Sequence, residues 1–154
     1  MYDFQKKLRE GQRHERFLDD YYRAKFAIEP ATMADERRGI DRFFTDRRTG
    51  RRYAIQYKAD TTAARTGNAF VETVSVDTTG APGWAHSCQA DFIVYYVVGV
   101  GPAYVVRPGD IRKRLKRWER EFPLRTIPSN GYSTVGILVP LDEFERIAYA
   151  ISHI

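Results

Sequence analysis

The chain has 154 residues, which is enough for one domain with a substantial core and too few for two ordinary domains. Its hydrophobic content of 43% excludes a mostly disordered chain, and no apolar run approaches the about 20 residues that cross a bilayer. The formal net charge is +5, and one cysteine, Cys88, excludes an internal disulfide or a cysteine-based zinc cluster. We expect a single cytoplasmic domain over residues 1–154.

The first half of the chain predicts one long helix followed by strands. Apolar residues recur at helical spacing after residue 4, and Pro30 stops any continuation. The expected segments are a helix over 4–26, a loop over 31–37, strands over 38–46 and 51–59, an irregular segment over 60–67 and a strand over 69–76.

The second half predicts further strands between shorter helices. The almost continuous apolar run at 91–98 is typical of a strand buried on both faces. The expected segments are a loop over 77–83, a short helix over 84–90, strands over 91–98 and 103–106, a helix over 108–121, a strand over 132–139 and a final helix from residue 140. This order predicts an α/β fold with one mixed central sheet flanked by helices.

Much of the positive charge is clustered. Runs of cations neutralise phosphates and release counterions, and the planar arginine fork suits phosphate oxygens. A solvated basic surface is the alternative, for the helix above all. The candidate nucleic-acid contacts are Arg47, Arg48, Arg51 and Arg52 at the turn between the first two strands, and Arg112, Lys113, Arg114 and Lys116 on the helix over 108–121.

Two acids stand where apolar or neutral residues are expected. Glu15 lies on the apolar stripe of the first helix, where a carboxylate needs a partner or a cation. Asp41 begins a strand, a structure in which aspartate is disfavoured. The alternatives are that the stripe curves and Glu15 reaches solvent, and that Asp41 is a residue of a strand-edge turn.

Three further polar residues lie on neighbouring strands. Gln56 and Lys58 are two residues apart, so they share one face of their strand. Glu72 shares its face with Phe70 and Val74. The alternative for Gln56 and Lys58 is the solvated face of an edge strand. The alternative for Glu72 is a cross-strand ion pair.

Together these residues indicate metal-assisted hydrolysis of a phosphodiester. Mg²⁺ prefers oxygen ligands and takes one or two carboxylates together with phosphate and water. Asp41 supplies a carboxylate, Gln56 supplies a neutral carbonyl oxygen, and Lys58 is placed to orient the attacking water. We expect Mg²⁺ or Mn²⁺ as the cofactor.

The same residues resemble the PD-(D/E)XK nuclease superfamily, which includes restriction endonucleases and archaeal Holliday junction resolvases. The stretch 11–18, with Glu15, is similar to the helix signature of the superfamily. Gly39-Ile40-Asp41 is similar to its aspartate strand, and Gln56-Tyr57-Lys58 is similar to its (D/E)-x-K tripeptide. The resemblance covers roughly residues 8–98. It implies a restriction endonuclease-like fold, a mixed central sheet flanked by helices.

Two positions depart from the superfamily pattern. Ile40 stands where proline is usual, and Gln56 stands where an acid is usual. Some members, including a group of homing endonucleases, resemble this chain in using Q-x-K. Because the glutamine removes one negative charge, the resemblance implies that Glu72 or Glu15 completes the metal site.

The resemblance implies a metal-dependent DNA endonuclease that acts as a homodimer, since cutting both strands takes two active sites. The alternatives are a DNA-binding module of the same fold without catalysis and an interaction protein whose arginines bind acidic partners. The implied catalytic residues are Glu15, Asp41, Gln56, Lys58 and Glu72, with the metal held by Asp41, Gln56, Glu72 and Glu15.

Overall fold

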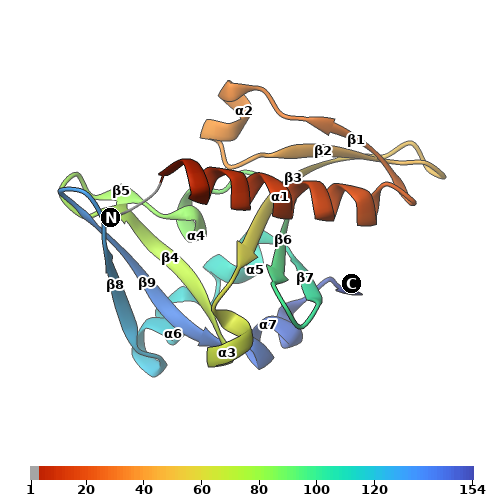
Figure 1. Ribbon diagram of the computed structural model, residues 1–154. Coiled ribbons are helices and arrows are strands. Elements are labelled where there is room, and N and C mark those ends of the chain that lie inside the picture. Colours follow the sequence, from red (N-terminus) through yellow and green to blue (C-terminus); the bar gives the residue numbers. More distant parts are fainter. Residues whose placement is uncertain (1–3) are drawn as a thin grey trace.

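The computed structural model of the protein describes residues 4–154, so three residues of the expected domain, 1–3, lie outside the described residues. The described chain is a mixed α/β structure with two sheets, one of six strands and one of four (Figure 1). No helix in this range is long and apolar enough to cross a membrane.

The six-strand sheet is mixed, and the four-strand sheet is antiparallel throughout. In the six-strand sheet only β3 and β6 run parallel. Its strands, in spatial order, are β1 Phe26–Pro30, β2 Arg42–Asp46, β3 Arg52–Asp60, β6 Phe92–Val97, β7 Pro102–Val106 and β10 Ala150–His153. The four-strand sheet has the order β5 Ala81–Pro82, β4 Asn68–Val76, β9 Ser133–Pro140 and β8 Leu124–Pro128.

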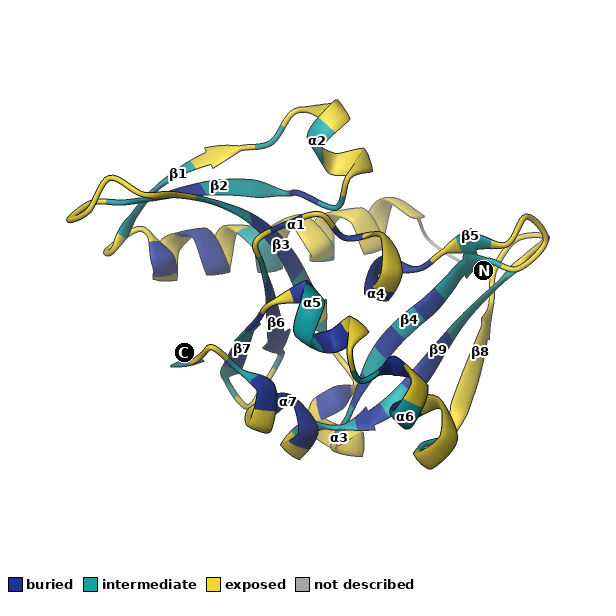
Figure 2. Cartoon of the chain, turned by 180° about the vertical axis from the view of Figure 1, so that it is seen from behind, coloured by how far each residue is buried: buried dark blue, intermediate teal, exposed yellow. Residues whose placement is uncertain are grey.

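The helices cover opposite sides of the six-strand sheet. The long first helix crosses one face, and α4 to α7 lie on the other side together with the second sheet (Figures 1 and 2). The helices are α1 Phe4–Tyr22, α2 Met33–Arg37, α3 Ala63–Thr66, α4 Trp84–Ser87, α5 Pro108–Arg112, α6 Leu115–Glu121 and α7 Leu141–Ile147.

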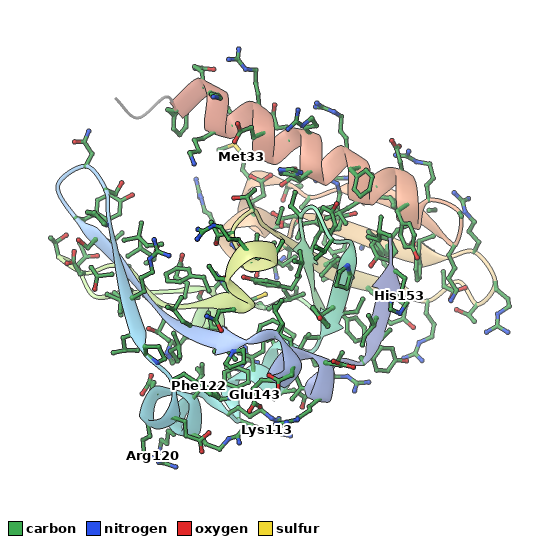
Figure 3. The ribbon with its side chains drawn as sticks, turned by 60° about the horizontal axis from the view of Figure 1, so that its bottom comes forward. Met33, Lys113, Arg120, Phe122, Glu143 and His153 are labelled. Atoms are coloured by element: carbon green, nitrogen blue, oxygen red, sulfur yellow. The ribbon has the colours of Figure 1, made fainter. Side chains whose placement is uncertain are left out.

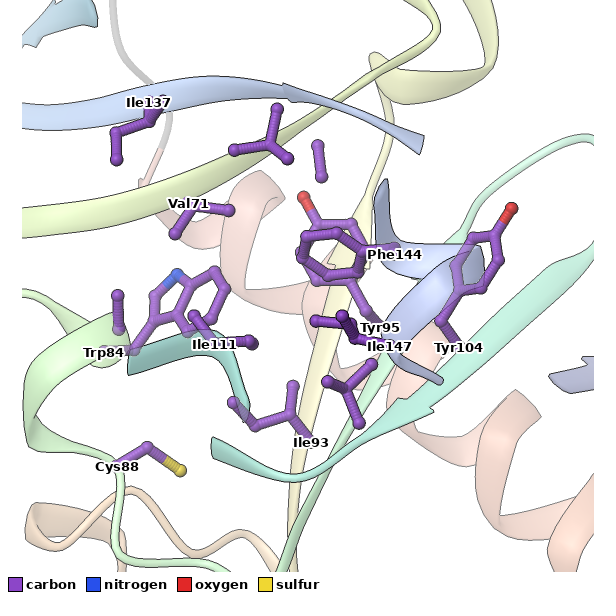
Figure 4. Packing of buried hydrophobic residues seen from close by; sticks show 14 of the residues in the cluster. Val71, Trp84, Cys88, Ile93, Tyr95, Tyr104, Ile111, Ile137, Phe144 and Ile147 are labelled. Atoms are coloured by element: carbon purple, nitrogen blue, oxygen red, sulfur yellow. The ribbon is translucent and has the colours of Figure 1, made fainter. Parts of the chain in front are cut away.

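Two apolar clusters fill the spaces on either side of the six-strand sheet. The smaller joins Leu18 and Tyr22 of α1 to Phe44 and Ile55 of the sheet. The larger lies between the two sheets and α4 to α7 (Figure 4). Strand β6 sends alternate side chains to each cluster, which confirms the prediction of a strand buried on both faces.

The prediction of one sheet is wrong, and so are several segments near the N-terminus. The first helix ends at Tyr22, because residues 26–30 pair with β2 as the antiparallel strand β1. The expected loop after Pro30 contains α2, which begins in a capping box between Thr32 and Asp35. The apolar stripe of α1 is not continuously buried either, since Phe4 and Leu8 are exposed.

The segments of the C-terminal third also differ from those expected from the sequence. The expected basic helix is broken into α5 and α6 at residues 113–114, and its apolar residues Ile111, Leu115 and Trp118 are buried. The final helix ends at Ile147, because residues 150–153 pair with β7 as β10. The exposed strand β8 pairs only with β9, and its sequence carries no alternation that identifies it.

The larger cluster depends on Phe144, which is fully buried and stacks on the ring of Trp118 with centroids 6.1 Å apart. Phe144→Ala removes these contacts and leaves a cavity, so we expect a loss of about 3–5 kcal/mol in the free energy of unfolding. Urea titration measures it. Phe4→Ala is the control, because Phe4 is largely exposed, and a change there as large as in Phe144→Ala would contradict the assignment of the core.

Candidate active site

A cleft opens on the side of β3 that faces the second sheet. It has a volume of about 360 Å³, and Lys58 of β3 and Glu72 of β4 both line it. Trp84, Tyr95 and Arg125 complete its walls from α4, β6 and β8. The structure therefore brings together two of the predicted catalytic residues, although they belong to different sheets.

Lys58 lies over the indole of Trp84. Its Nζ is 5.9 Å from the ring centroid, within the range of a cation–π contact. The ammonium also lowers the pKa of Glu72 through its charge. Among residues 4–154 no carboxylate oxygen lies within 4.0 Å of Lys58 Nζ, so the ammonium is held near Glu72 without a direct ion pair.

Glu72 is a partly buried carboxylate. Burial raises its pKa above the ordinary value of 4.5, and the Lys58 charge and a hydrogen bond from the Trp84 backbone N–H offset only part of this effect. Burial, and not the cross-strand ion pair that was the alternative explanation of Glu72, is therefore the main influence on its pKa. The group is instead a proton acceptor of raised basicity inside the cleft.

Local backbone features aim Glu72 into the cleft. The register of β4 against β9 shifts between Glu72 and Val74, a bulge that redirects the strand. Gly83 packs directly against Glu72, since a Cβ on this glycine would lie 2.4 Å from the Glu72 carbonyl oxygen and 2.7 Å from its Cγ. No larger residue fits there, and the glycine thereby allows α4 to begin beside Glu72 with Trp84.

Asp41 is fixed at the junction of β2 and β3. Its backbone N–H donates to the Ile55 carbonyl at 2.8 Å, and its Oδ2 accepts the Tyr57 backbone N–H at 2.8 Å. Continuing the β2–β3 register by one residue beyond Arg42 and Ile55 places Asp41 across from Gln56. No donor within residues 4–154 forms a hydrogen bond to Oδ1, the second carboxylate oxygen.

Gln56 is buried, and its Oε1 has no hydrogen-bond partner among the described residues. An unpaired buried amide oxygen costs about 1–3 kcal/mol, so it marks a place where a donor or a cation is expected. The amide lies against Gly39, whose ideal Cβ would be 3.4 Å from Nε2. Gly39 also has a φ of +78°, a conformation that favours glycine.

Glu15 approaches from the other face of the sheet. Its Oε2 pairs with Arg42 Nη2 at 3.3 Å, and Arg42 Nε also pairs with Asp19 at 3.1 Å. Tyr57 donates its hydroxyl to the same Asp19 at 2.8 Å. Because side chains alternate along β3, Tyr57 and Lys58 point to opposite faces, and Glu15 belongs to the Tyr57 side, away from Lys58.

Glu15 is nevertheless within electrostatic reach of Asp41. Burial raises the pKa of Glu15, the Arg42 charge lowers it, and the Asp41 charge raises it again. Burial likewise raises the pKa of the Cys88 thiol, and that thiol senses the charges of both Lys58 and Asp41. Cys88 is a buried free thiol that packs against Gly39.

The predicted metal ligands do not form one carboxylate cluster. Among residues 4–154 no group of three or more His, Cys, Asp or Glu side chains is placed to hold a metal ion. The arrangement consists instead of Asp41 beside Gln56 and of Glu72 beside Lys58. Asp41 and Gln56 together offer one carboxylate and one neutral oxygen, the types of ligand that Mg²⁺ takes together with water and phosphate.

No family model, curated protein or solved structure matches the chain. The residues and their geometry are therefore the only basis for a function.

Sequence reasoning missed several residues of the cleft. Asp60 accepts hydrogen bonds from Thr62, Ala63 and the Tyr95 hydroxyl, and thereby joins the end of β3 to β6 and α3. The Tyr95 hydroxyl also accepts the Phe70 backbone N–H at 3.0 Å, which fixes β4 against the six-strand sheet. The Asp-Thr-Thr sequence that begins at the last residue of β3 is a capping signal that could have identified Asp60.

The raised pKa of Glu72 gives a pH-dependent test. The folded state binds this proton more tightly than the unfolded state, so stability falls as pH rises from about 4.5 through the raised pKa. Glu72→Gln removes this loss. Without added metal, we expect the variant to have the higher melting temperature at pH 7, with a difference that shrinks toward zero as pH falls below 4.5.

Thermal unfolding at a series of pH values measures this difference. Each kcal/mol shifts the melting temperature by about 2–4 °C for a chain of this length. Glu119→Gln is the control, since Glu119 is exposed on α6. An equal shift in both variants, or a difference in Glu72→Gln that does not depend on pH, would contradict the buried-carboxylate assignment.

Proposed function

We propose that the protein is a metal-dependent endonuclease that hydrolyses phosphodiester bonds in DNA, of the PD-(D/E)XK type with a Q-x-K motif. The observation that carries this proposal is the cleft in which Lys58 and Glu72 meet over Trp84. Asp41 lies directly before β2, and Gln56, with its unpaired Oε1, lies on β3 two residues before Lys58.

The placement of the motif residues supports the proposed type. Glu15 lies on the N-terminal helix, Asp41 precedes β2, and Gln56 and Lys58 lie on β3, which pairs with β2. β3 also pairs in parallel with β6 across a crossover that carries Glu72. The sequence of helix, Asp41 and Q-x-K strand follows the motif order of the resemblance, although β1 and α2 come between the helix and Asp41 and a second antiparallel sheet is present.

The donor set fits a hard divalent cation. Gln56 Oε1 is buried without a partner, Asp41 retains one carboxylate oxygen outside its backbone hydrogen bond, and Glu72 adds a second acid. Asp41, Gln56 and Glu72 would hold Mg²⁺ or Mn²⁺, with Glu15 contributing charge from the Arg42 side. A bound ion would polarise the phosphoryl oxygens and lower the pKa of the attacking water.

The chain's own groups perform the remaining work. Lys58 supplies a positive charge beside the phosphate and orients the attacking water by donating a hydrogen bond. Glu72 supplies the second carboxylate beside Lys58, in a position where burial raises its pKa. Trp84 holds the ammonium over its ring, so that Lys58 does not collapse onto Glu72 as a closed ion pair.

One observation favours a second function, a DNA-binding module of the same fold without catalysis. Gln56 replaces an acid, and no group of three metal-binding acids forms within residues 4–154. Such a module would bind DNA with the same surfaces and leave it intact. Metal-dependent cleavage separates the two functions.

Lys58→Ala tests the proposal. We expect the variant to fold and to bind DNA with affinity within about twofold of the parent, but to lose at least about 100-fold in cleavage rate in Mg²⁺, since positioned electrostatic groups contribute about that much. Branched and linear DNAs incubated with and without Mg²⁺ give the rates. Lys25→Ala is the matched control, because Lys25 lines a hollow on the α1 side of the sheet.

Two results of the cleavage assay would contradict the proposal. Cleavage by Lys58→Ala at the parental rate would show that the cleft is not the active site. Binding without any cleavage by the parent protein, in Mg²⁺ or Mn²⁺, would replace the proposal with the DNA-binding module.

A further inference from the structure

The two basic runs, about 60 residues apart in the sequence, form the walls of one groove. The groove has a volume of about 580 Å³ and lies between the β2–β3 turn and the start of α5. We call it the basic groove. Its cations are Arg51, Arg52, Arg107, Arg112 and Lys113, against two carboxylates, Asp91 and Asp110.

The cations of this groove are mostly not neutralised by carboxylates. Elsewhere in the described chain arginines pair with acids, as Arg42 does with Asp19. In the groove only Arg52 takes part in an ion pair, a long one of 3.9 Å with Glu29 between exposed side chains, which is worth little. Asp91 is occupied differently, because its Oδ2 accepts the Ala54 backbone N–H at 2.7 Å.

The guanidinium groups are instead held on aromatic rings. Arg52 lies 4.0 Å from the ring centroid of Phe43, and Arg107 lies 4.5 Å from that of Tyr149. Arg51 lies 5.7 Å from the centroid of Tyr53. A stacked guanidinium loses conformational freedom while its N–H donors stay available at the edge, an arrangement suited to phosphate oxygens.

The groove borders the candidate active site. Arg112 Nη1 donates to the Cys88 carbonyl at 3.2 Å, and Cys88 packs against Gly39 next to Gln56. Phe43, under Arg52, belongs to the same side of the six-strand sheet as the larger apolar cluster. Arg52 and the cleft therefore lie on one side of β3, whereas Tyr53 and Tyr149, under Arg51 and Arg107, also line the hollow on the α1 side.

We infer that the basic groove binds consecutive phosphates of the DNA strand that enters the cleft. This inference rests on the proposed function, and it defines the path of the substrate beyond the reacting phosphate. Arg51 and Arg52 contact the strand from the β2–β3 turn, and Arg107 and Lys113 contact it from α5 and the residues beside it. Arg107, which lies outside the basic runs that the sequence singles out, becomes a phosphate contact.

The test removes one cation from each wall. The groove variant combines Arg51→Gln with Arg107→Gln. The control variant combines Arg120→Gln with Arg146→Gln, which removes the same charge from exposed positions on α6 and α7. Arg120 projects away from the body of the molecule (Figure 3). Binding of a fluorescent DNA duplex of about 20 base pairs is measured by anisotropy with Ca²⁺ in place of Mg²⁺, at several salt concentrations.

Each lost phosphate contact lowers the slope of log affinity against log salt by about 0.9 for duplex and about 0.7 for a single strand. We expect the slope of the groove variant to fall by about twice the change for one phosphate contact, and the slope of the control to stay at the parental value. In cleavage assays the groove variant raises KM and leaves kcat within about twofold. Single variants at Arg51 and Arg107 each lose about half of the slope change.

Three results would overturn the inference. In the first, the groove variant keeps the parental slope of log affinity against log salt. In the second, the control loses as much of this slope as the groove variant. In the third, the groove variant loses binding to poly-glutamate while its slope for DNA is unchanged, which would assign the groove to an acidic protein. If the parent binds DNA through the groove but never cleaves it, the nuclease proposal fails and the groove assignment stands.

Discussion

The alternation of side chains along β3 is the constraint on which the rest of the structure depends. Tyr57 points toward α1 and donates to Asp19, which Arg42 also binds. Gln56 and Lys58 point to the opposite side, toward the second sheet and α4. One strand thus fixes the N-terminal helix with one set of residues and supplies the candidate active site with the other.

A partly buried carboxylate lies on each face of the six-strand sheet, and its cation partner determines how that face behaves. Glu15 and Glu72 are each partly buried, each has a raised pKa caused first by that burial, and each has one cation nearby. On the α1 side the cation, Arg42, is hydrogen-bonded to its acids and the network is closed. On the cleft side Lys58 rests on Trp84 instead, so the charges there stay available to a ligand. The closed network stabilises the fold, and the open one is suited to chemistry.

The parts of the site that follow from local spacing could be predicted from the sequence. Gln56 and Lys58 share a face because they are two residues apart, and the hairpin brings Asp41 opposite Gln56. The partner of Glu15 could not be predicted, because it depends on how α1 crosses the sheet. The meeting of Glu72 with Lys58 depends on a bulge in β4 and on close packing of Gly83, neither of which has a short-range signal.

The fold shows the same division between local and long-range information. The buried strand β6 was evident from its apolar run, whereas β1 and β10 form only because β2 and β7 offer them an edge. The second sheet was missed because β8 is exposed along its length and is defined only by its pairing with β9. The basic groove likewise joins two runs that the sequence presents as separate surfaces.

The central claim is that Asp41, Gln56 and Glu72 hold a divalent ion beside Lys58. Crystals soaked in Mn²⁺ and measured at a wavelength where manganese scatters anomalously test it directly. The account predicts an anomalous peak within about 2.0–2.6 Å of an Asp41 oxygen and of Gln56 Oε1 or a Glu72 oxygen, the range of metal–oxygen bonds. A protein that cleaves DNA in Mn²⁺ but binds the ion elsewhere, or binds none at these residues, would contradict it.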